Sequence, residues 1–330
     1  MKIIMGLKGI RKPLKGSVVT IGVFDGIHVG HEKIIRRTVR QARRLHLKSV
    51  LLTFDPHPFK ILDRTEKVPS LISLKHRISL IGSLGVDYTV VLKFTEQLSR
   101  LSSVSFVKNI LLGKLGMKEI CVGENFYFGS GAKAGIPELK EMGERLSFKV
   151  EAIRPVMSGS RVVSSSLIRR LIIKGDIRAA SKFLGRPVSI LGTVVSGDGR
   201  GRLLGFPTAN IDPHHEAIPP GGVYAVLVRL DKDILKGVLN IGLRPTFFKY
   251  SPEPEPSIEV HILDFNRDIY DKDLEIMFIC KLRDEAHFKD ECGLMAQIKK
   301  DVKRSRAILR RVDKKAFTNK MNCVNIFKSK

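Results

Sequence analysis

Two glycine-rich segments of this 330-residue chain combine residue types that handle phosphate groups. Residues 22–31 read Gly-Val-Phe-Asp-Gly-Ile-His-Val-Gly-His, and residues 197–210 read Gly-Asp-Gly-Arg-Gly-Arg-Leu-Leu-Gly-Phe-Pro-Thr-Ala-Asn. Glycine lets the backbone approach a polyphosphate closely, because no side chain stands in the way. Neither segment has the pattern of a Walker loop or of a dinucleotide fingerprint. We therefore interpret them as two separate nucleotide sites, which predicts two reactions.

Two histidines give the first segment its chemistry. His28 and His31 are three residues apart, and a helical pattern begins near Gly30. At a helix N-terminus both imidazoles would join free backbone N–H groups in binding a triphosphate. Asp25 has a competing role as a turn residue or helix cap.

In the second segment, Thr208 and Asn210 offer a hydroxyl and an amide oxygen, which are hard ligands suited to Mg²⁺. Pro-Thr-Ala-Asn is also typical of a simple turn. Further along, period-two alternation places Glu259 and His261 on the opposite strand face from the apolar residues between them. Glu259 at this position fits either an ordinary solvent-facing residue or a carboxylate that accepts the proton of an alcohol attacking a phosphoryl group. A metal site made from Glu259 and His261 is the rival interpretation, but it lacks further ligands nearby.

The elements that must position these residues differ between the two halves. In the first half, short apolar runs alternate with helical patterns, which predicts a Rossmann-like parallel sheet with ligands beyond the carboxyl ends of its strands. The predicted strands are 18–23, 49–54, 88–92 and 120–122, and the predicted helices after the one near Gly30 are 74–84 and 103–112. Helical stretches 165–174 and 176–183 then end at Gly185 and Pro187.

Beyond Pro187 the pattern changes to successive strands separated by turn residues, which predicts a small antiparallel β-barrel with a carboxy-terminal helix. The predicted strands are 190–195, 222–228, 236–241, 257–263 and 274–279. We expect domains at 1–184 and 185–312, followed by a basic tail at 313–330.

Composition narrows the class of protein. Hydrophobic residues make up 43% of the chain, but no apolar run has the length of a membrane span. A net charge of +25 attracts nucleic acid, yet the basic residues are spread along the chain, aromatic content is 7%, and tryptophan is absent. We therefore expect no specific nucleic-acid partner and no membrane. The four cysteines form no Cys-x-x-Cys pair, which favours the cytoplasm, and a homo-oligomer remains open.

The segment at 22–31 resembles the His-x-Gly-His nucleotidyltransferases. Its full pattern, Gly-x-Phe-Asp-Gly-x-His-x-Gly-His, closely resembles that of the prokaryotic bifunctional riboflavin kinase/FAD synthetase family. Further segments match that family in order: 54–58, 123–129, 163–169, 197–210, 222–225, 240–246, 259–265 and 282–285. Two departures are visible. Ser166 stands where the family usually has threonine, and Asp271 follows Tyr270 where glycine is common, which predicts a reshaped turn.

The resemblance implies that the barrel phosphorylates riboflavin with ATP, that the α/β domain adenylylates FMN with release of pyrophosphate, and that Mg²⁺ serves both steps. It also implies roles for individual residues. Catalysis falls to Glu259, His28 and His31; nucleotide binding in the first half to Gly22, Phe24, Gly30, Asn125, Arg161, Ser164 and Arg169; flavin binding to Phe54, Pro56, Pro58 and Arg283; and nucleotide binding in the kinase to Gly201, Gly205, Thr208 and Asn210, of which the last two hold the metal.

For two of these residues, a purely structural role is the alternative. Arg161 also fits a solvated turn residue, and Arg283 also fits an ordinary surface ion pair. At the level of the whole chain, one rival is a different His-x-Gly-His enzyme, such as a cytidylyl- or pantetheine-phosphate adenylyltransferase, which leaves the second half unexplained. The other rival is a basic RNA-binding protein.

Overall fold

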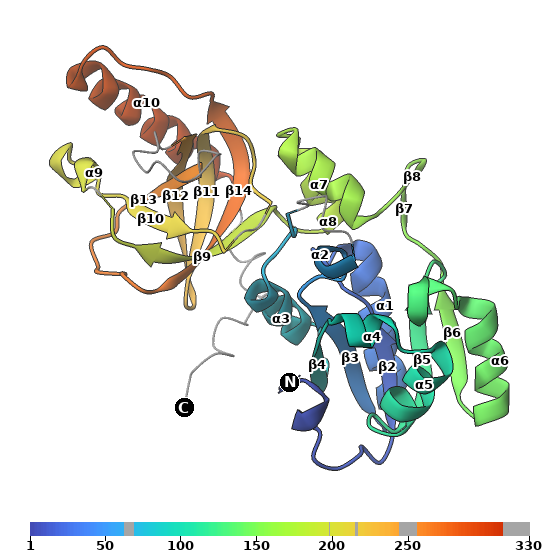
Figure 1. Ribbon diagram of the computed structural model, residues 1–330. Helices are drawn as coiled ribbons and strands as arrows, with labels where there is room; N and C mark the ends of the chain where they lie inside the picture. Colours follow the sequence, from blue (N-terminus) through green and yellow to red (C-terminus); the bar gives the residue numbers. More distant parts are fainter. Residues whose placement is uncertain (63–68, 198, 215–216, 244–255, 313–330) are drawn as a thin grey trace. The chain divides into compact units, whose positions relative to one another are not determined.

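The chain folds into two units, each built around its own sheet (Figure 1). The computed structural model describes residues 1–62, 69–197, 199–214, 217–243 and 256–312. The first unit contains Met1–Ser70 and Arg77–Ser165, and the second contains Leu71–His76 and the residues from Ser166 onward. The predicted tail at 313–330 lies outside the described residues.

The first unit is organised by a six-stranded sheet in which every strand pair is parallel. In spatial order the strands are β1 (Lys2–Met5), β4 (Tyr88–Lys93), β3 (Lys48–Asp55), β2 (Ser17–Ile21), β5 (Met117–Gly123) and β6 (Lys149–Ile153). From β2 the chain adds β3 and β4 on one side and then returns to add β5 and β6 on the other. The predicted parallel sheet is confirmed, and β1 and β6 are edge strands that the sequence patterns did not reveal.

The helices of this unit follow the apolar stripes of the sequence. On α1 the buried side chains include Ile35, Val39 and Ala42, whereas the arginines at 36, 40, 43 and 44 are outside the core. The helical elements are η1 (Leu7–Gly9), α1 (Val29–Arg44), α2 (Phe59–Leu62), α3 (Leu74–Ser83), α4 (Glu96–Ser99), α5 (Ser103–Ser105), the π-helix η2 (Phe106–Leu112), η3 (Ser130–Ala132) and α6 (Ile136–Leu146). A short hairpin of β7 (Met157–Ser158) and β8 (Arg161–Val162) follows.

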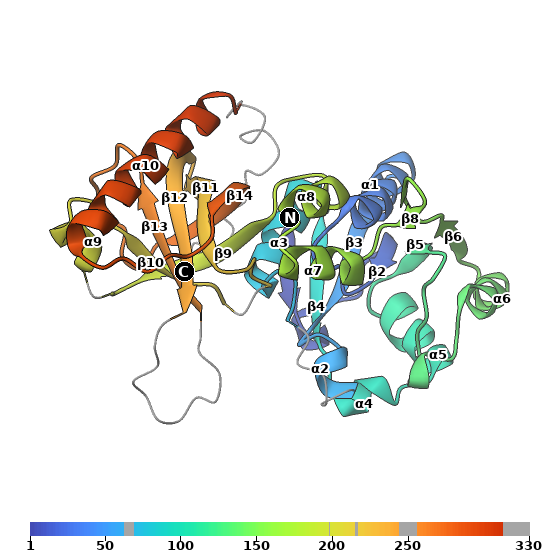
Figure 2. The same ribbon diagram turned by 90° about the horizontal axis from the view of Figure 1, so that it is seen from above.

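The second unit is a closed antiparallel barrel, as predicted. Around the barrel the strands are β10 (Ala209–Asp212), β13 (Pro256–Ile262), β12 (Asp233–Leu243), β11 (Gly222–Leu230), β14 (Asp273–Arg283) and β9 (Ser189–Val195). Its helices are α7 (Ser165–Ile173), α8 (Ile177–Leu184), α9 (Arg200–Leu203) and the terminal α10 (Glu291–Arg310). Helix α10 packs against β11, β12 and β14 (Figure 2), and this confirms the predicted terminal helix.

The turn before β14 has a backbone conformation that glycine favours. Asp271 has φ 58°, in the left-handed region. Aspartate tolerates this region better than most residues, because its short side chain can bond locally. Aspartate at this position is therefore compatible with the left-handed backbone of the turn.

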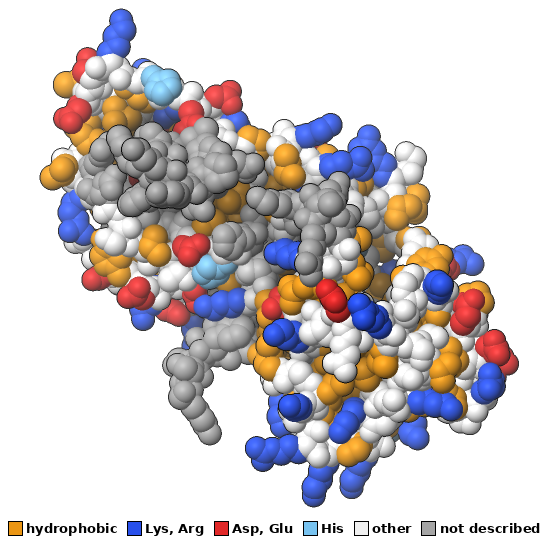
Figure 3. Space-filling view, in the orientation of Figure 1, with side chains coloured by type: hydrophobic (Ala, Val, Ile, Leu, Met, Phe, Trp, Pro, Cys, Tyr) orange, Lys and Arg blue, Asp and Glu red, His pale blue; other side chains and the backbone are white. Residues whose placement is uncertain are grey.

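Basic side chains are spread over the face of the first unit that Figure 3 shows. On the face shown in Figure 3, Lys and Arg side chains of the first unit are scattered among apolar and uncharged groups rather than gathered in one stripe. Within the described residues, no helix combines the length and apolarity that crossing a bilayer requires.

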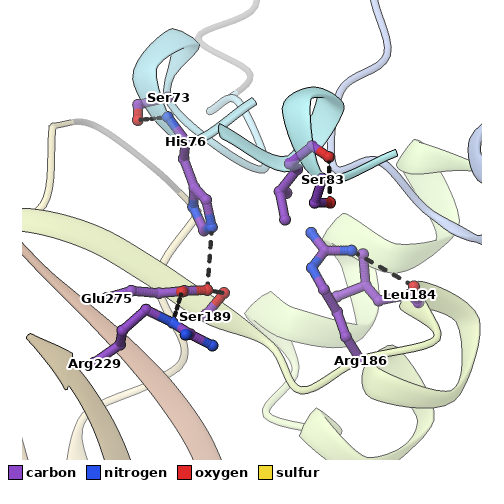
Figure 4. Close-up of polar contacts among 9 residues, drawn as sticks. Ser73, His76, Ser83, Leu184, Arg186, Ser189, Arg229 and Glu275 are labelled. Carbon is purple, nitrogen blue, oxygen red and sulfur yellow. Dashed lines mark hydrogen bonds and ion pairs between the residues drawn. The ribbon is translucent and has the colours of Figure 1, made fainter. Parts of the chain in front are cut away.

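A buried ionic network lies beside the barrel strands (Figure 4). The carboxylate of Glu275 on β14 accepts hydrogen bonds from Ser189 (2.9 Å) and Arg229 (3.1 Å), and His76 Nε2 lies 3.4 Å from it. Glu275, Arg229 and His76 are each at most 3% exposed. Burial alone raises the pKa of Glu275, but the hydrogen bond and charge of His76, followed by Arg229 and Ser189, lower it from 4.5 to about 2.

This pKa has a direct consequence for stability. Because the folded protein holds Glu275 ionised below the pKa of an unfolded glutamate, the network stabilises the fold above about pH 4.5 and loses this contribution as the pH falls toward 2. We expect the free energy of unfolding of the wild type to fall more steeply between about pH 6 and pH 3 than that of Glu275→Gln, as measured by denaturant titration followed by circular dichroism. The exposed residue Glu291 supplies the matched control, and Glu291→Gln should keep the wild-type slope. Equal slopes for the wild type and Glu275→Gln would contradict this prediction.

Candidate active sites

The first candidate site is the loop that follows β2, at the carboxyl end of the sheet. Strand β2 lies between β3 and β5, where the strand order reverses, and open parallel sheets bind ligands at such a point. The loop backbone is unusual: Phe24, Gly26 and Ile27 have φ values of 54°, 84° and 39°. Left-handed conformations are disfavoured for bulky residues and cluster at ligand sites. Phe24 and Ile27 are both buried, which fixes the loop despite this strain.

His28 and His31 are stacked at the start of α1. Their ring centroids are 3.6 Å apart with an interplanar angle of 19°. His28 is the N-cap, and its Nδ1 accepts a hydrogen bond from the backbone N–H of His31 at 3.3 Å. Because Nδ1 accepts, the proton of a neutral His28 ring must be on Nε2. A Cβ atom at Gly30 would lie 3.1 Å from the His28 ring, so glycine leaves the room that the stack occupies.

Arg77 supports this loop, and sequence reasoning did not find it. Its guanidinium donates to the carbonyl of Val23 at 2.7 Å and to that of Phe54 at 3.0 Å. It thereby ties the ends of β2 and β3 together. Burial lowers the pKa of Arg77, while Asp25 and Asp55 oppose the shift. Ser165 adds a second tie, because its hydroxyl donates to the carbonyl of Asp25 at 2.8 Å.

The other predicted residues of the first half lie on several elements. Asn125 is exposed just after β5, and Arg161 is exposed on β8. Ser164 lies before α7 at the end of the first unit, and Arg169 lies on α7, which groups with the second unit.

The predicted flavin loop begins at the end of β3. Phe54 packs edge-on against Phe94, with ring centroids 5.7 Å apart. The following Asp55–Pro56 peptide bond is cis, and the carbonyl of Pro58 accepts from the backbone of α2. Gly22 supports the adjacent loop, because a Cβ atom there would lie 3.2 Å from the Phe24 ring.

The second candidate site lies in the barrel, where β10 pairs with β13. Asn210 is directly opposite Glu259 in this pairing, and the Oγ1 of Thr208 donates to Glu259 Oε2 at 3.4 Å. The predicted alternation on β13 is confirmed, since Ile258, Val260 and Ile262 are buried. A Cβ atom at Gly197 would fall 1.9 Å from Asn210 Nδ2, so only glycine leaves the amide in this place.

The loop between α9 and β10 folds tightly on itself. The backbone N–H of Phe206 donates to the carbonyl of Gly201 at 2.8 Å. A Cβ atom at Gly201 would lie 2.9 Å from Thr208 Oγ1, and Gly205 has φ 79°. Both glycines therefore shape the backbone that presents Thr208.

Two cavities meet at Thr208. One, of about 390 Å³, is lined by apolar side chains that include Val194, Ile262, Phe265 and Tyr270. The other, of about 300 Å³, is lined by Glu259, His261 and Arg283 together with Leu204, Val238 and Phe288. Thr208 is on the wall of both. Thr208 is therefore accessible from both cavities.

Arg283 forms an ion pair and also lines a cavity. It lines the second cavity while its Nε donates to Asp301 at 2.9 Å, and Asp301 is only 5% exposed. Gln297 donates to the other oxygen of the same carboxylate at 2.9 Å. The pair joins β14 to α10. Asp301 is a support that sequence reasoning missed, because its partner lies on a different element.

A different group of metal-type ligands, Glu119, Cys121 and Glu151, lies in the first unit. Here Arg37 already binds both oxygens of Glu151 at 2.8 Å. Burial, together with Glu151, raises the pKa of the Cys121 thiol to about 12, so the thiol stays protonated. The carboxylate of Glu151 therefore already has a cationic partner in Arg37.

Comparison with known proteins accounts for both units. A model of the FAD synthetase family matches residues 10–167, and a model of the riboflavin kinase family matches residues 184–309. A solved chain described as a macrolide-efflux protein from Streptococcus pneumoniae has the same fold, with a TM-score of 0.81 and 30% identity over 93% of this chain and 99% of that chain.

Curated relatives match along nearly their whole length, and each is described as a bifunctional riboflavin kinase/FMN adenylyltransferase. The protein of Buchnera aphidicola subsp. Schizaphis graminum is 36% identical over 92% of this chain and 97% of its own. That of Bacillus subtilis is 36% identical over 88% and 92%, and that of Escherichia coli K12 is 33% identical over 91% and 96%. The chain thus belongs to the bifunctional riboflavin kinase/FMN adenylyltransferase family and has both activities of that family.

Proposed function

We propose that the kinase reaction takes place where the two barrel cavities meet, with riboflavin in the 300 Å³ cavity and ATP in the 390 Å³ cavity. The single observation that carries this assignment is the position of Thr208, which lines both cavities and donates to Glu259. The apolar walls of each cavity suit a planar ring, and the polar groups between them suit the reacting atoms.

Glu259 is the general base of this proposal. Its carboxylate takes the proton of the primary alcohol of riboflavin as the alcohol oxygen attacks the γ-phosphorus of ATP. The bond to the β–γ bridging oxygen breaks, and ADP departs with the electron pair, leaving FMN. Positioning and charge neutralisation supply most of the rate in such transfers. Arg283, held by Asp301, is proposed to fix the flavin beside Glu259.

Thr208 and Asn210 are the residues that would hold Mg²⁺ on the nucleotide phosphates. Their hydroxyl and amide oxygens are ligands that this ion accepts, and both residues lie at the β10 end next to Glu259. The ion would neutralise charge on the β- and γ-phosphates. Gly201 and Gly205 keep the preceding loop compact so that Thr208 reaches this position.

The adenylylation of FMN is proposed for the loop after β2. An oxygen of the FMN phosphate attacks the α-phosphorus of ATP, and pyrophosphate leaves. The phosphate is already mostly ionised near neutral pH, so the work of the site is to align it and to stabilise charge on the leaving group.

Residues for that second step are proposed in two groups. His28, His31, Ser164 and Arg169 contact the phosphates, and Gly22, Phe24, Gly30, Asn125 and Arg161 shape or bind the nucleotide site. The flavin is proposed to lie against Phe54, Pro56 and Pro58. Support comes from the stacked histidines at the positive end of α1, where a helix N-terminus favours anions.

At the level of the chain, we propose an adenylyltransferase domain at 1–184 and a kinase domain at 185–312, acting in the cytoplasm. The match of residues 184–309 to riboflavin kinases supports this division. It also accounts for the half of the chain that a lone His-x-Gly-His transferase would leave unexplained.

Two substitutions separate the proposed sites. Glu259→Gln keeps the shape of the side chain but removes the base, so FMN formation from riboflavin should fall on the order of 10²- to 10⁴-fold while adenylylation of supplied FMN continues. His28→Ala should do the reverse, with a loss of adenylylation on the order of 10²-fold or more. In each variant, the activity that is retained shows that the protein is folded. Both activities are measured by chromatography of FMN and FAD. If either substitution abolished both activities, the assignment of one site to each of the two proposed domains would be wrong.

The metal ligands are tested through the dependence on Mg²⁺. Thr208→Val removes a hydroxyl at nearly constant volume, so FMN formation should need a higher Mg²⁺ concentration and reach a lower maximum rate. Thr208→Ser keeps the oxygen and should stay close to the wild type. The rate of FMN formation is measured over a Mg²⁺ titration at saturating riboflavin. A valine variant with the same Mg²⁺ midpoint as the serine variant would show that the hydroxyl does not bind the ion.

A further inference from the structure

Strand β13 holds the loop in front of β10 at two points. The first is the 3.4 Å hydrogen bond from Thr208 to Glu259. The second joins His261 to the preceding residue, because His261 Nδ1 lies 2.8 Å from the carbonyl oxygen of Pro207. The Phe206 ring packs edge-on against the His261 ring, with centroids 5.7 Å apart and an interplanar angle of 83°.

The second contact fixes the state of the imidazole. A carbonyl oxygen only accepts, so the His261 nitrogen that faces Pro207 must carry a proton. This bond uses Nδ1, and a metal site built from Glu259 and His261 would have only Nε2 of the ring left. We therefore interpret His261 as a residue that binds the loop through Pro207 and not as a metal ligand.

Phosphoryl transfer affects the two contacts differently: it competes with the bond between Thr208 and Glu259 but not with the bond between His261 and Pro207. In the proposed function, Glu259 must turn its carboxylate to the riboflavin alcohol, and Thr208 must turn its oxygen to Mg²⁺ on the nucleotide. The 3.4 Å bond between them then competes with both tasks. The bond between His261 and Pro207 uses no group that the chemistry needs, so it can persist throughout.

We propose that His261 is a positioning residue of the kinase: by donating from Nδ1 to the Pro207 carbonyl, it keeps Thr208 at the nucleotide when Glu259 engages the flavin. This role rests on the proposed function of Glu259 and Thr208. It goes beyond that function because it assigns the task of holding the loop to a residue that takes no part in proton or phosphoryl transfer.

Three substitutions test the role in the full-length protein. His261→Asn places an amide nitrogen near the position of Nδ1, whereas His261→Gln reaches the position of Nε2, and His261→Ala offers neither. A single lost hydrogen bond corresponds to a change of roughly threefold to tenfold. We expect Ala and Gln to raise the KM for Mg-ATP in FMN formation by roughly this factor, with the KM for riboflavin unchanged. Asn should restore the KM for Mg-ATP to within about twofold of the wild type.

Adenylylation of supplied FMN by the same preparations is the internal control, because it uses the other unit and should be unchanged. An Asn variant no better than Ala, or a KM increase for riboflavin in place of Mg-ATP, would overturn the positioning role. The second outcome would show that His261 contacts the flavin in the cavity that it lines. A wild-type chain that forms no FMN would refute the kinase assignment itself, whereas wild-type kinetics in His261→Ala would refute only the role of His261.

Discussion

The proposed kinase site depends on one feature of the fold: strand β10 closes the barrel. This strand has only four residues, yet it pairs with β9 on one side and with β13 on the other. The pairing with β13 brings Asn210 opposite Glu259 and ends the loop at Thr208, next to the same carboxylate. Without these backbone hydrogen bonds, the proposed metal ligands Thr208 and Asn210 would not lie beside Glu259, the proposed base. Gly197 permits the closure, because any larger residue would occupy the place of the Asn210 amide.

The two units meet the same requirement, close approach to phosphate, by different means. In the sheet, the reversal of strand order opens a site after β2, and a strained loop delivers two stacked histidines to the start of a helix. In the barrel, the proposed oxygen ligands come from Thr208, just before β10, and from Asn210 on β10, a strand that is paired on both edges. In our proposal, the first arrangement uses the dipole of α1, whereas the second uses oxygen ligands, which suit a metal-bound phosphate.

Much of this organisation could be predicted from the sequence, since local patterns determine it. The helix beginning near Gly30, the parallel sheet and the alternation on β13 all follow from periodicity, and the structure confirms them. Strand β10 was missed because four residues after a proline carry too short a pattern to distinguish a strand from a turn. Arg77 and Asp301 were missed for another reason: each acts through partners that are distant in sequence, and neither has a local pattern that marks it. The site roles inferred from the family resemblance stay predictions until the substitutions are made.

The grouping of residues 71–76 with the second unit has a consequence for dissection of the gene. These residues lie inside the stretch that matches FAD synthetases, yet His76 completes the environment of Glu275 on β14. A fragment encoding only the stretch that matches riboflavin kinases would keep Glu275 and Arg229 but would lack this imidazole. No single cut in the sequence therefore separates the two units. A shortened flavokinase would therefore hold its buried carboxylate with Arg229 and Ser189 alone.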